Sequence, residues 1–461
     1  MKEQGLHIII VGCGKVGRNL VGQLRKEGHF ITVIDRNPAV LSEMENLYDI
    51  MSVNGNGASY SVQSEAGVDN ADLLIAVTGS DELNLLCCTV ARRAANCAAI
   101  ARVRDPDYSK EAAYLQEKLG LAMIVNPELE TAREISHILT FPVALDVSPF
   151  ARGLAEIIRM KIAPGDMLCG RKLQDFGKKI AGSVLIGAVE RDGDVYIPSG
   201  SFELAEGDIV SFVTERKLVQ QFFHAIHIRT GQVRSAMIIG GGKGGYYLGK
   251  RLLDRGVEVK IIEKNRKRCE YLAGILHDAV IINGDGTSAE LLREEGIHYS
   301  ESVIPLTGID EQNVFLTLYA RQQNPDAKTI TRISRSEFKE VFTSLNLGSI
   351  IDPNAITVEE IIAYVRAKNN SRGNDIDTLY HLYDNRVEAI EFRVIQESEV
   401  TGKRLMDLHL KDNLLIACID RGGRIIIPGG NDRIEVGDAV MVVTTNMGMK
   451  ELTEILDTER V

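Results

Sequence analysis

Short apolar runs alternate with amphipathic stretches over roughly the first 125 residues. The pattern predicts strands at 7–11, 30–34, 49–53, 72–77 and 98–103, and helices at 15–27, 38–47, 81–95 and roughly 128–140. Strands that alternate in this way with amphipathic helices favour a parallel sheet with helices on both faces. We therefore expect an α/β domain of the Rossmann type.

The pattern changes after about residue 151. Short strand-like runs are now separated by turn pairs, at Pro164-Gly165, Asp192-Gly193, Ser199-Gly200 and Glu206-Gly207. Such spacing is typical of short antiparallel strands with some helix, so a small α+β domain is expected here.

The whole pattern then occurs a second time. Val11–Gly17 corresponds to Ile239–Gly245, and Thr78–Asn84 corresponds to Thr307–Asn313. In the small domain, Gly170-Arg-Lys-Leu173 resembles Gly402-Lys-Arg-Leu405. This tandem duplication predicts two doubly wound parallel-sheet domains, at 1–140 and 233–368, and two small α+β domains, at 151–217 and 375–461. Residues 217–232 and 368–374 are expected to be connectors.

Each copy contains a glycine loop directly after its first strand. The spacing G-x-G-x-x-G at a strand–helix junction allows a tight turn, lets the backbone approach a phosphate, and packs the helix against the strand. The N-terminus of the helix offers free N–H groups to the phosphate. The candidate binding residues are Gly12, Cys13, Gly14, Lys15, Val16 and Gly17 in the first copy, and Gly240, Gly241, Gly242, Lys243, Gly244 and Gly245 in the second.

An acidic residue follows each loop at the position where a ribose would be held. Asp35 and Glu263 each lie 21 residues after the middle glycine of their loop. A carboxylate there accepts hydrogen bonds from ribose hydroxyls and repels a 2′-phosphate. The sequence therefore favours NAD(H) or an adenosine nucleotide over NADP(H).

Further candidate residues follow the fourth and fifth strands, whose carboxyl ends border the ligand crevice of open α/β sheets. These are Thr78, Gly79 and Arg102, with Thr307 and Arg332 in the second copy. Either arginine could contact a ligand, or could pair with a carboxylate at the edge of the core. Both interpretations remain open at this point.

Two features of the loops have alternative explanations. The second loop is almost entirely glycine, with Gly244 in place of Val16, which indicates either additional loop flexibility or a different ligand. Cys13, near a helix N-terminus, could have a lowered thiol pKa, although a small residue that fits the turn is the simpler interpretation.

Composition argues against several ligands and locations. Lys and Arg total 53 against 64 Asp and Glu, and a net charge of −11 argues against nucleic acid as a ligand. The seven cysteines are scattered without zinc-ligand spacing, so no metal site is expected. No apolar stretch approaches the ~20 residues of a membrane span, and the N-terminus lacks the pattern of a secretory signal.

No acid–base pair or nucleophile motif is repeated in both copies. The repeated segment Asn54–Gly57 has turn chemistry. Ligand binding without catalysis is therefore the preferred interpretation, and an NAD-dependent oxidoreductase is the alternative.

The loop, Asp35, the Gly55/Gly57 turn, Ala76–Glu82 and Arg102 resemble the KTN or RCK domain of potassium-transport regulators. Two such domains in one chain, each followed by a small C-terminal domain, are similar to the peripheral regulatory subunits of bacterial and archaeal Trk potassium uptake systems. The resemblance implies a cytoplasmic gating ring, peripheral on the inner membrane face beneath a potassium transporter. The paired repeats themselves suggest a closed homo-oligomer, a dimer or tetramer ring. It implies NAD(H) and, in some members, ATP or ADP as ligands at the candidate residues above. A regulator of another ion transport system is the related alternative.

Overall fold

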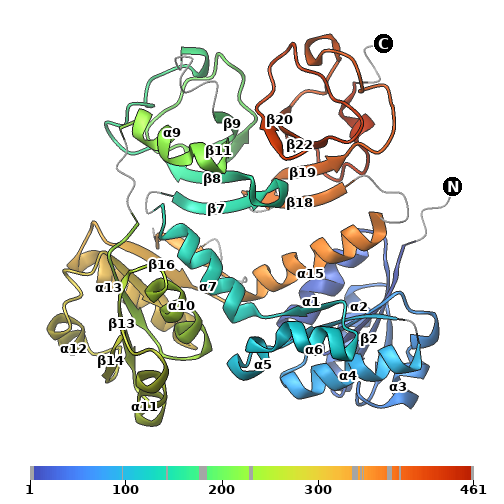
Figure 1. Cartoon of the computed structure of the whole chain (residues 1–461), viewed down its shortest axis with the longest axis vertical. Coiled ribbons are helices and arrows are strands. Elements are labelled where there is room, and N and C mark those ends of the chain that lie inside the picture. Colours follow the sequence, from blue (N-terminus) through green and yellow to red (C-terminus); the bar gives the residue numbers. More distant parts are fainter. Residues whose placement is uncertain are drawn as a thin grey trace. The chain divides into compact units, whose positions relative to one another are not determined.

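The computed structural model describes residues 5–95, 97–141, 144–175, 184–227, 232–334, 341–342, 345, 347–370, 376–383 and 386–457. The chain forms two compact units, which we describe separately. One contains Met1–Ser136 and Val233–Tyr364, and the other contains His137–Gln232 and Val365–Val461. The two Rossmann-like copies therefore share one unit, and the two small domains share the other (Figure 1).

The first Rossmann-like copy is built on a parallel sheet of six strands in the order β3-β2-β1-β4-β5-β6. Its strands are β1 (His7–Val11), β2 (Phe30–Asp35), β3 (Met51–Asn54), β4 (Leu73–Ala76), β5 (Ala98–Arg102) and β6 (Met123–Val125). Its helices are α1 (Lys15–Lys26), α2 (Pro38–Leu47), α3 (Tyr60–Glu65), α4 (Asp81–Ala94), α5 (Pro106–Lys110), α6 (Ala112–Leu119) and α7 (Pro127–Ile138).

The second copy repeats this order as β14-β13-β12-β15-β16-β17. Its strands are β12 (Ser235–Ile239), β13 (Glu258–Glu263), β14 (Val280–Asn283), β15 (Ser302–Pro305), β16 (Lys328–Arg332) and β17 (Ser349–Ile351). The helices described for it are α10 (Lys243–Leu253), α11 (Arg266–Ile275), α12 (Ala289–Glu294), α13 (Asp310–Gln323) and α15 (Pro353–Asn370). The predicted duplication of a doubly wound parallel sheet is confirmed.

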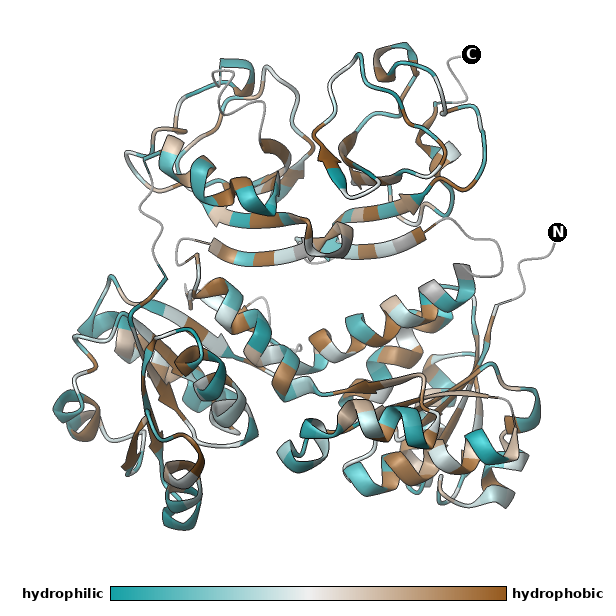
Figure 2. Ribbon diagram, in the orientation of Figure 1, coloured by the Kyte–Doolittle hydropathy of each residue, from teal (hydrophilic) through white to brown (hydrophobic). Residues whose placement is uncertain are grey.

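Both faces of the sheets are covered by helices. Consecutive strand residues point to opposite faces, and in the central strands both sets are buried. In β1, residues 8–11 are at most 2% exposed. Ile9 and Val11 share a core cluster with Cys87 and Cys88 of α4. The central strands are correspondingly apolar in Figure 2. Because the strand order reverses between β1 and β4, the loops after these strands border a crevice at the carboxyl edge of the sheet.

Each small domain contains a five-stranded antiparallel sheet, in the orders β10-β9-β11-β8-β7 and β18-β19-β22-β20-β21. The strands of the first are β7 (Ala144–Phe150), β8 (Ala155–Lys161), β9 (Val184–Arg191), β10 (Asp194–Tyr196) and β11 (Ile209–Glu215). Those of the second are β18 (Ile376–Leu382), β19 (Val387–Arg393), β20 (Leu414–Arg421), β21 (Arg424–Ile426) and β22 (Ala439–Thr444).

The two small domains share a hydrophobic core. Ile157 and Val213 of the first pack in one cluster with Ala389 and Val443 of the second. The buried hydroxyl of Tyr383 lies 2.7 Å from Ser211 Oγ, which adds a polar contact inside this core. The pair therefore forms one folded body.

A repeated arginine–aspartate pair accounts for the Gly-Asp pairs of the small domains, Gly207-Asp208 and Gly437-Asp438. Arg191 donates two hydrogen bonds to the buried Asp208, both at 2.7 Å, and Arg421 donates two to Asp438, at 2.9 and 2.8 Å. Each aspartate also accepts a backbone N–H three residues before it. These motifs therefore serve the fold.

Helices and strands occupy parts of the chain that the sequence analysis assigned to connectors. Helix α9 (Val219–Ala225) lies inside the expected connector 217–232, and its Phe222 and Phe223 pack in the core of the first small domain. Helix α15 continues to Asn370, so the polar stretch 368–374 begins as helix, and its residues 371–374 lie outside the described residues. Strand β7 joins the first small sheet from residue 144, before the expected start at 151. Within the described part of the chain, no helix is both long and apolar enough to cross a bilayer.

Candidate functional site

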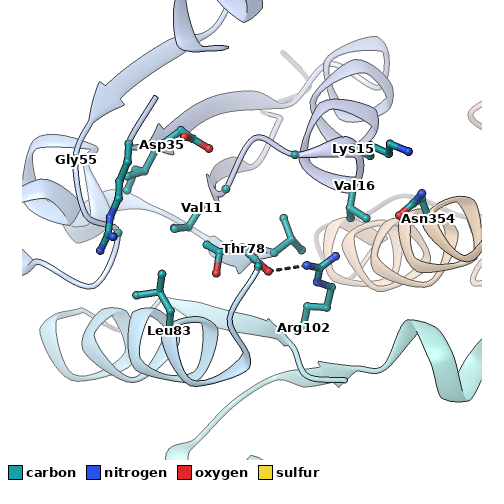
Figure 3. Close-up of a pocket in the computed structure, with 16 residues that line it drawn as sticks. Val11, Lys15, Val16, Asp35, Gly55, Thr78, Leu83, Arg102 and Asn354 are labelled. Atoms are coloured by element: carbon teal, nitrogen blue, oxygen red, sulfur yellow. Dashed lines mark hydrogen bonds between the residues drawn. The ribbon is translucent and has the colours of Figure 1, made fainter. Parts of the chain in front are cut away.

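A cavity of about 440 Å³ opens at the crevice of the first Rossmann-like copy (Figure 3). The loops after β1, β2, β3 and β4 contribute to it, together with the end of β5 and the start of α15. Its lining consists of Val11, Gly12, Gly14, Lys15, Val16, Ile34, Asp35, Arg36, Gly55, Gly57, Val77, Thr78, Gly79, Leu83, Arg102 and Asn354.

Two glycines of the first loop are required by the fold. Gly12 has a φ of +97°, which side chains rarely adopt, and a Cβ there would lie 3.0 Å from the Thr78 backbone. A Cβ on Gly17 would lie 2.1 Å from the carbonyl oxygen of Gly12. These two positions therefore fix the turn and the close approach of α1 to β1.

Gly14 is different, because nothing in the fold requires it to be glycine. Its φ is −73°, and a Cβ built there meets no atom within 4 Å. Gly79 has the same freedom. Since both line the cavity, their missing side chains leave the backbone open to a ligand that approaches closely.

The start of α1 has N–H groups available for an anion. Gly14 is the N-cap and provides no side-chain hydrogen bond, and the first turn contains no acidic residue. In α4, by contrast, the side chain of Ser80 caps Leu83 N, and Asp81 and Glu82 occupy the first turn. An anion at Gly14–Val16 would supply the missing acceptor and interact favourably with the helix dipole.

Asp35 lies at the end of β2 and holds two backbone N–H groups. Its Oδ2 accepts from Cys13 N at 2.7 Å, and its Oδ1 accepts from Asn37 N at 2.9 Å. Each carboxylate oxygen has a second lone pair, so the side chain can still accept hydroxyl groups from a ligand. Asp35 thus orders the glycine loop and lines the cavity at the same time.

Thr78 and Arg102 belong to a network organised by the buried Asn84. Asn84 Oδ1 accepts from Thr78 N at 2.8 Å and from Thr78 Oγ1 at 2.7 Å, while its Nδ2 donates to Arg102 O at 2.8 Å. Arg102 Nη2 donates to Thr78 O at 2.6 Å, as drawn in Figure 3. The Thr78 hydroxyl proton is therefore committed to the fold, and it is the backbone here that is positioned for binding.

Arg102 supplies positive charge to the cavity wall. Its Nε is buried and has no hydrogen-bond partner among the described residues. Burial, and to a lesser extent repulsion by Arg104, lowers the pKa of its guanidinium, which nevertheless stays charged. Of the two interpretations left open above, the position on the cavity wall favours contact with a ligand.

The second Rossmann-like copy contributes to the cavity of the first. Asn354, the second residue of α15, lines it beside Lys15 and Val16 (Figure 3). Lys15 Nζ also donates to the carbonyl oxygen of Ser334, at 3.3 Å. A ligand in this cavity would therefore touch both copies.

The structure separates the predicted residues of the first copy into two groups. Gly12, Gly14, Lys15, Val16, Asp35, Thr78, Gly79 and Arg102 line the cavity, whereas Cys13 and Gly17 do not. Cys13 is 3% exposed, and burial raises the pKa of its thiol to about 11, which supports the packing interpretation of this residue. The cavity also includes Arg36, Leu83 and Asn354, which we did not predict.

The second copy repeats the loop geometry with changed side chains. Glu263 Oε2 accepts from Gly241 N at 2.8 Å, and Asn313 forms the same bonds to Thr307 as Asn84 forms to Thr78. Arg332 Nη1 donates to Thr307 O at 3.0 Å. Gly241, Glu263, Thr307 and Arg332 thus lie together at the carboxyl edge of the second sheet.

The glycine-rich second loop has a partial explanation in packing. A Cβ on Gly241 would lie 2.7 Å from Leu272 Cδ1 and 2.9 Å from Glu263 Cβ. By contrast, a Cβ on Gly242 or Gly244 meets nothing within 4 Å. Gly241 is therefore required by packing, in part against the longer acid, while Gly242 and Gly244 leave open space.

No group of three or more His, Cys, Asp or Glu side chains with the geometry of a metal site occurs among the described residues. Cys87 and Cys88 are buried, and burial raises their thiol pKa values, that of Cys87 to about 12. These two cysteines are therefore small residues of the core.

Family profiles match both halves of the chain. The TrkA-N domain matches residues 8–127 and 236–353, and the TrkA-C domain matches residues 157–227 and 389–457. The chain belongs to the TrkA family. The TrkA-N matches cover both glycine loops, and the TrkA-C matches cover most of both small domains.

Relatives named as TrkA proteins align over almost the full chain. A protein of Methanosarcina mazei named Trk system potassium uptake protein TrkA homolog 1 is 30% identical over 453 residues, covering 96% of this chain and 98% of its own. The Trk system potassium uptake protein TrkA of Halomonas elongata is 30% identical over 444 residues, covering 95% of each chain. The duplicated organisation is thus common to this chain and to these relatives.

Solved structures of GsuK share the fold. The GsuK RCK domain has a TM-score of 0.63 at 18% sequence identity and covers 97% of this chain and 94% of its own. A GsuK channel bound to NAD has a TM-score of 0.62 at 19% identity, covering 97% of this chain and 78% of that one. The expected RCK-type architecture is confirmed.

Proposed function

We propose that this chain is the nucleotide-binding regulatory subunit of a Trk-type potassium uptake system. The observation that carries the proposal is the pair Gly14 and Gly79, two cavity glycines that the fold does not require. Asp35, a carboxylate suited to ribose, lines the same cavity. Membership of the TrkA family, whose relatives are named as potassium uptake proteins, supports the physiological role.

NAD(H) is the proposed ligand of the first copy, with ATP or ADP as related candidates. The N–H groups at the start of α1 would hold the phosphates, with Lys15 and Arg102 providing countercharge. Asp35 would hold a ribose, and the apolar wall at Leu83 is available to a base. The titratable groups in the lining are Lys15, Asp35, Arg36 and Arg102, a set that suits binding and charge neutralisation.

The proposed mechanism is a shift between arrangements of the two Rossmann-like copies. Asn354 and the Lys15–Ser334 contact bring both copies to the first cavity. A bound nucleotide therefore stabilises whichever arrangement gives it better contacts, and the shift equals the difference in its affinity for the two. Coupling of this kind is typically about 1–3 kcal/mol.

The proposed partner is a membrane-embedded potassium transporter of the Trk type. The chain would bind it from the cytoplasm, as a peripheral protein on the inner face of the membrane, and would act as a closed homo-oligomer, a dimer or a tetramer ring. The names of the relatives and the two-copy architecture support this assignment.

Reconstituted transport tests the proposal. Proteoliposomes that contain a Trk-type transporter with this chain bound should change their rubidium tracer uptake when NADH or ATP is added. The same vesicles with the Asp35→Asn chain should respond only at higher nucleotide concentration. If uptake is independent of nucleotide with the unaltered chain, the proposed regulation is wrong.

A further inference from the structure

The two copies differ most in charge immediately after their ribose-binding acids. The segment Asp35–Leu41 contains one cation and one anion, for a net charge of zero. The matching segment Glu263–Cys269 contains four cations and one anion, for a net charge of +3. The duplication has therefore placed three additional positive charges beside the second acid.

These cations lie at the N-terminal end of a helix, where positive charge is electrostatically unfavourable. Arg266, Lys267 and Arg268 occupy the first turn of α11, which has no acidic residue there. Positive side chains at a helix N-terminus oppose the helix dipole, and α13 of the same copy begins with Asp310 and Glu311 instead. The basic turn is therefore not explained by helix stability.

Arg268 extends from this turn to the glycine loop. Its Nε donates to Gly241 O at 2.7 Å and its Nη2 to Gly242 O at 3.2 Å, and the guanidinium lies 4.8 Å from the centre of the Tyr271 ring. These contacts use two of its five N–H groups. In the first copy the matching position is Val40, which has no donor.

The charge at the other end of the second loop is already paired. Lys243 Nζ lies 3.1 Å from Asp105 and 3.9 Å from Asp81, both in the first copy. Lys15, its equivalent, contacts a carbonyl oxygen. The second loop thus has a paired lysine where the helix N-terminus meets the loop. Beside the acid, Lys264 and Arg266 pair with Asp285 and Glu270, whereas the hydrogen bonds of Arg268 go to backbone carbonyl oxygens.

We propose that Arg268 is a specificity-determining residue, and that the second copy binds a nucleotide with a phosphate on its adenosine ribose, of the NADP(H) class. This rests on the proposed function, namely that the glycine loops bind nucleotides. Gly242 and Gly244 leave room at the loop, and Arg268 supplies the donor geometry that suits a phosphate dianion.

Glu263 does not prevent this assignment. Its two oxygens accept backbone N–H groups from Gly241 and Asn265, at 2.8 and 2.7 Å, which partly compensate its charge. Asp285 and Glu270 pair with Lys264 and Arg266 and offset part of the added positive charge, while Arg268 keeps N–H groups for a ligand. The first copy, whose matching segment has Arg36 as its one cation, keeps the preference for an unphosphorylated ribose.

Calorimetry on the full chain tests the inference in a Gly14→Val background, where the new side chain fills the first cavity. NADPH should bind there at least about tenfold more tightly than NADH, and Arg268→Val should lower NADPH affinity by about tenfold or more. Arg266→Ala removes the same charge from a side chain that is 84% exposed and paired with Glu270, and should change NADPH affinity less than twofold. Thermal unfolding should show that both variants remain folded, and Arg268→Gln serves if Arg268→Val does not fold.

The outcomes separate this inference from the proposed function. Equal affinity for NADPH and NADH in the Gly14→Val background overturns the inference, as do unchanged NADPH binding in Arg268→Val and equal losses in Arg268→Val and Arg266→Ala. If the unaltered chain binds NADH and loses it on Gly14→Val, the proposed function survives such a result. If the unaltered chain binds no nucleotide, the proposed function itself fails.

Discussion

The carboxylate of Asp35 accepts a hydrogen bond from the backbone N–H of Cys13 at 2.7 Å and so connects the end of β2 to the glycine loop after β1. Glu263 and Gly241 repeat the contact at 2.8 Å in the second copy. The acid therefore orders the loop before any ligand is bound. A preordered loop reduces the entropy that a ligand must overcome on binding.

Asp35→Asn should weaken NADH binding at the first copy by about ten- to a hundredfold, because hydrogen bonds to a charged group contribute about 1.5–3 kcal/mol. The amide keeps the size of the side chain but loses the charge and one acceptor. Calorimetry on the full chain measures the change. Glu263→Gln is the matched control and should leave this binding event intact. Unchanged NADH affinity in Asp35→Asn would show that the ribose is held elsewhere.

Gly14→Ala should mainly lower nucleotide affinity, whereas Gly17→Ala should mainly lower the free energy of unfolding. A Cβ on Gly14 meets no atom within 4 Å, so the variant should lose no more than about 1 kcal/mol of unfolding free energy, the cost of alanine at an N-cap, and yet lose nucleotide affinity. A Cβ on Gly17 would lie 2.1 Å from Gly12 O, and overpacking of this kind costs about 1–3 kcal/mol or more. Urea unfolding measures the stability of both variants, and calorimetry measures their nucleotide affinity. Normal binding by Gly14→Ala would remove the argument from the open cavity wall.

Asn354→Asp should separate stability from binding. An acid in the first turn of α15 gains about 0.3–1 kcal/mol from the helix dipole but loses the Asn354 Nδ2 hydrogen bond to Ser334 O at 3.3 Å, so the free energy of unfolding should change little. The same charge beside Lys15 should repel phosphates and raise the Kd for NADH by about tenfold. Asn354→Ala, which adds no charge, is the control and should bind nearly as wild type. An aspartate variant with wild-type affinity would mean that the phosphates do not lie near α15.

Glu360 should make stability depend on pH. Burial, and then repulsion by Glu130 on α7, raises the pKa of the Glu360 carboxyl to about 8, while Arg133 lowers it in part. Its Oε2 has no hydrogen-bond partner among the described residues. Because the folded state holds this proton more tightly than the unfolded state, the stabilisation is complete below the unfolded pKa and is lost as pH rises toward 8.

Glu360→Gln should therefore unfold at a higher temperature than wild type, by an amount that grows between pH 5 and pH 9 in this pKa window. Thermal unfolding of both proteins across the range measures the difference. Glu359→Gln, at the neighbouring exposed position, controls for the loss of a surface charge. A constant difference between Glu360→Gln and wild type at all pH values would contradict the raised pKa.

The sequence was sufficient for the architecture and for most of the first site. Strand and helix periodicity located the elements of the parallel sheets, because β1 and β4 are buried on both faces and hence continuously apolar. The glycine spacing located the loop, and the acid after β2 followed from it. These are local signals, each contained within one strand–loop–helix segment.

The remaining features depend on contacts between distant segments. Asn354 follows Gly14 by 340 residues and reaches the cavity only because the two Rossmann-like copies pack together. Cys13 and Gly17 satisfy the motif but turn away from the cavity, one toward the core and the other toward Gly12. The role of Asn84 was missed because its repeated motif indicated a ligand site, whereas its side chain organises Thr78 and Arg102.

A structure of the full chain determined with excess NADH tests the central claim most directly. The account predicts that the pyrophosphate lies within hydrogen-bonding distance of the backbone N–H groups at Gly14–Val16, with a ribose hydroxyl on the carboxylate of Asp35. NADH bound away from the first glycine loop, with the cavity beside Gly14 left vacant, would contradict it.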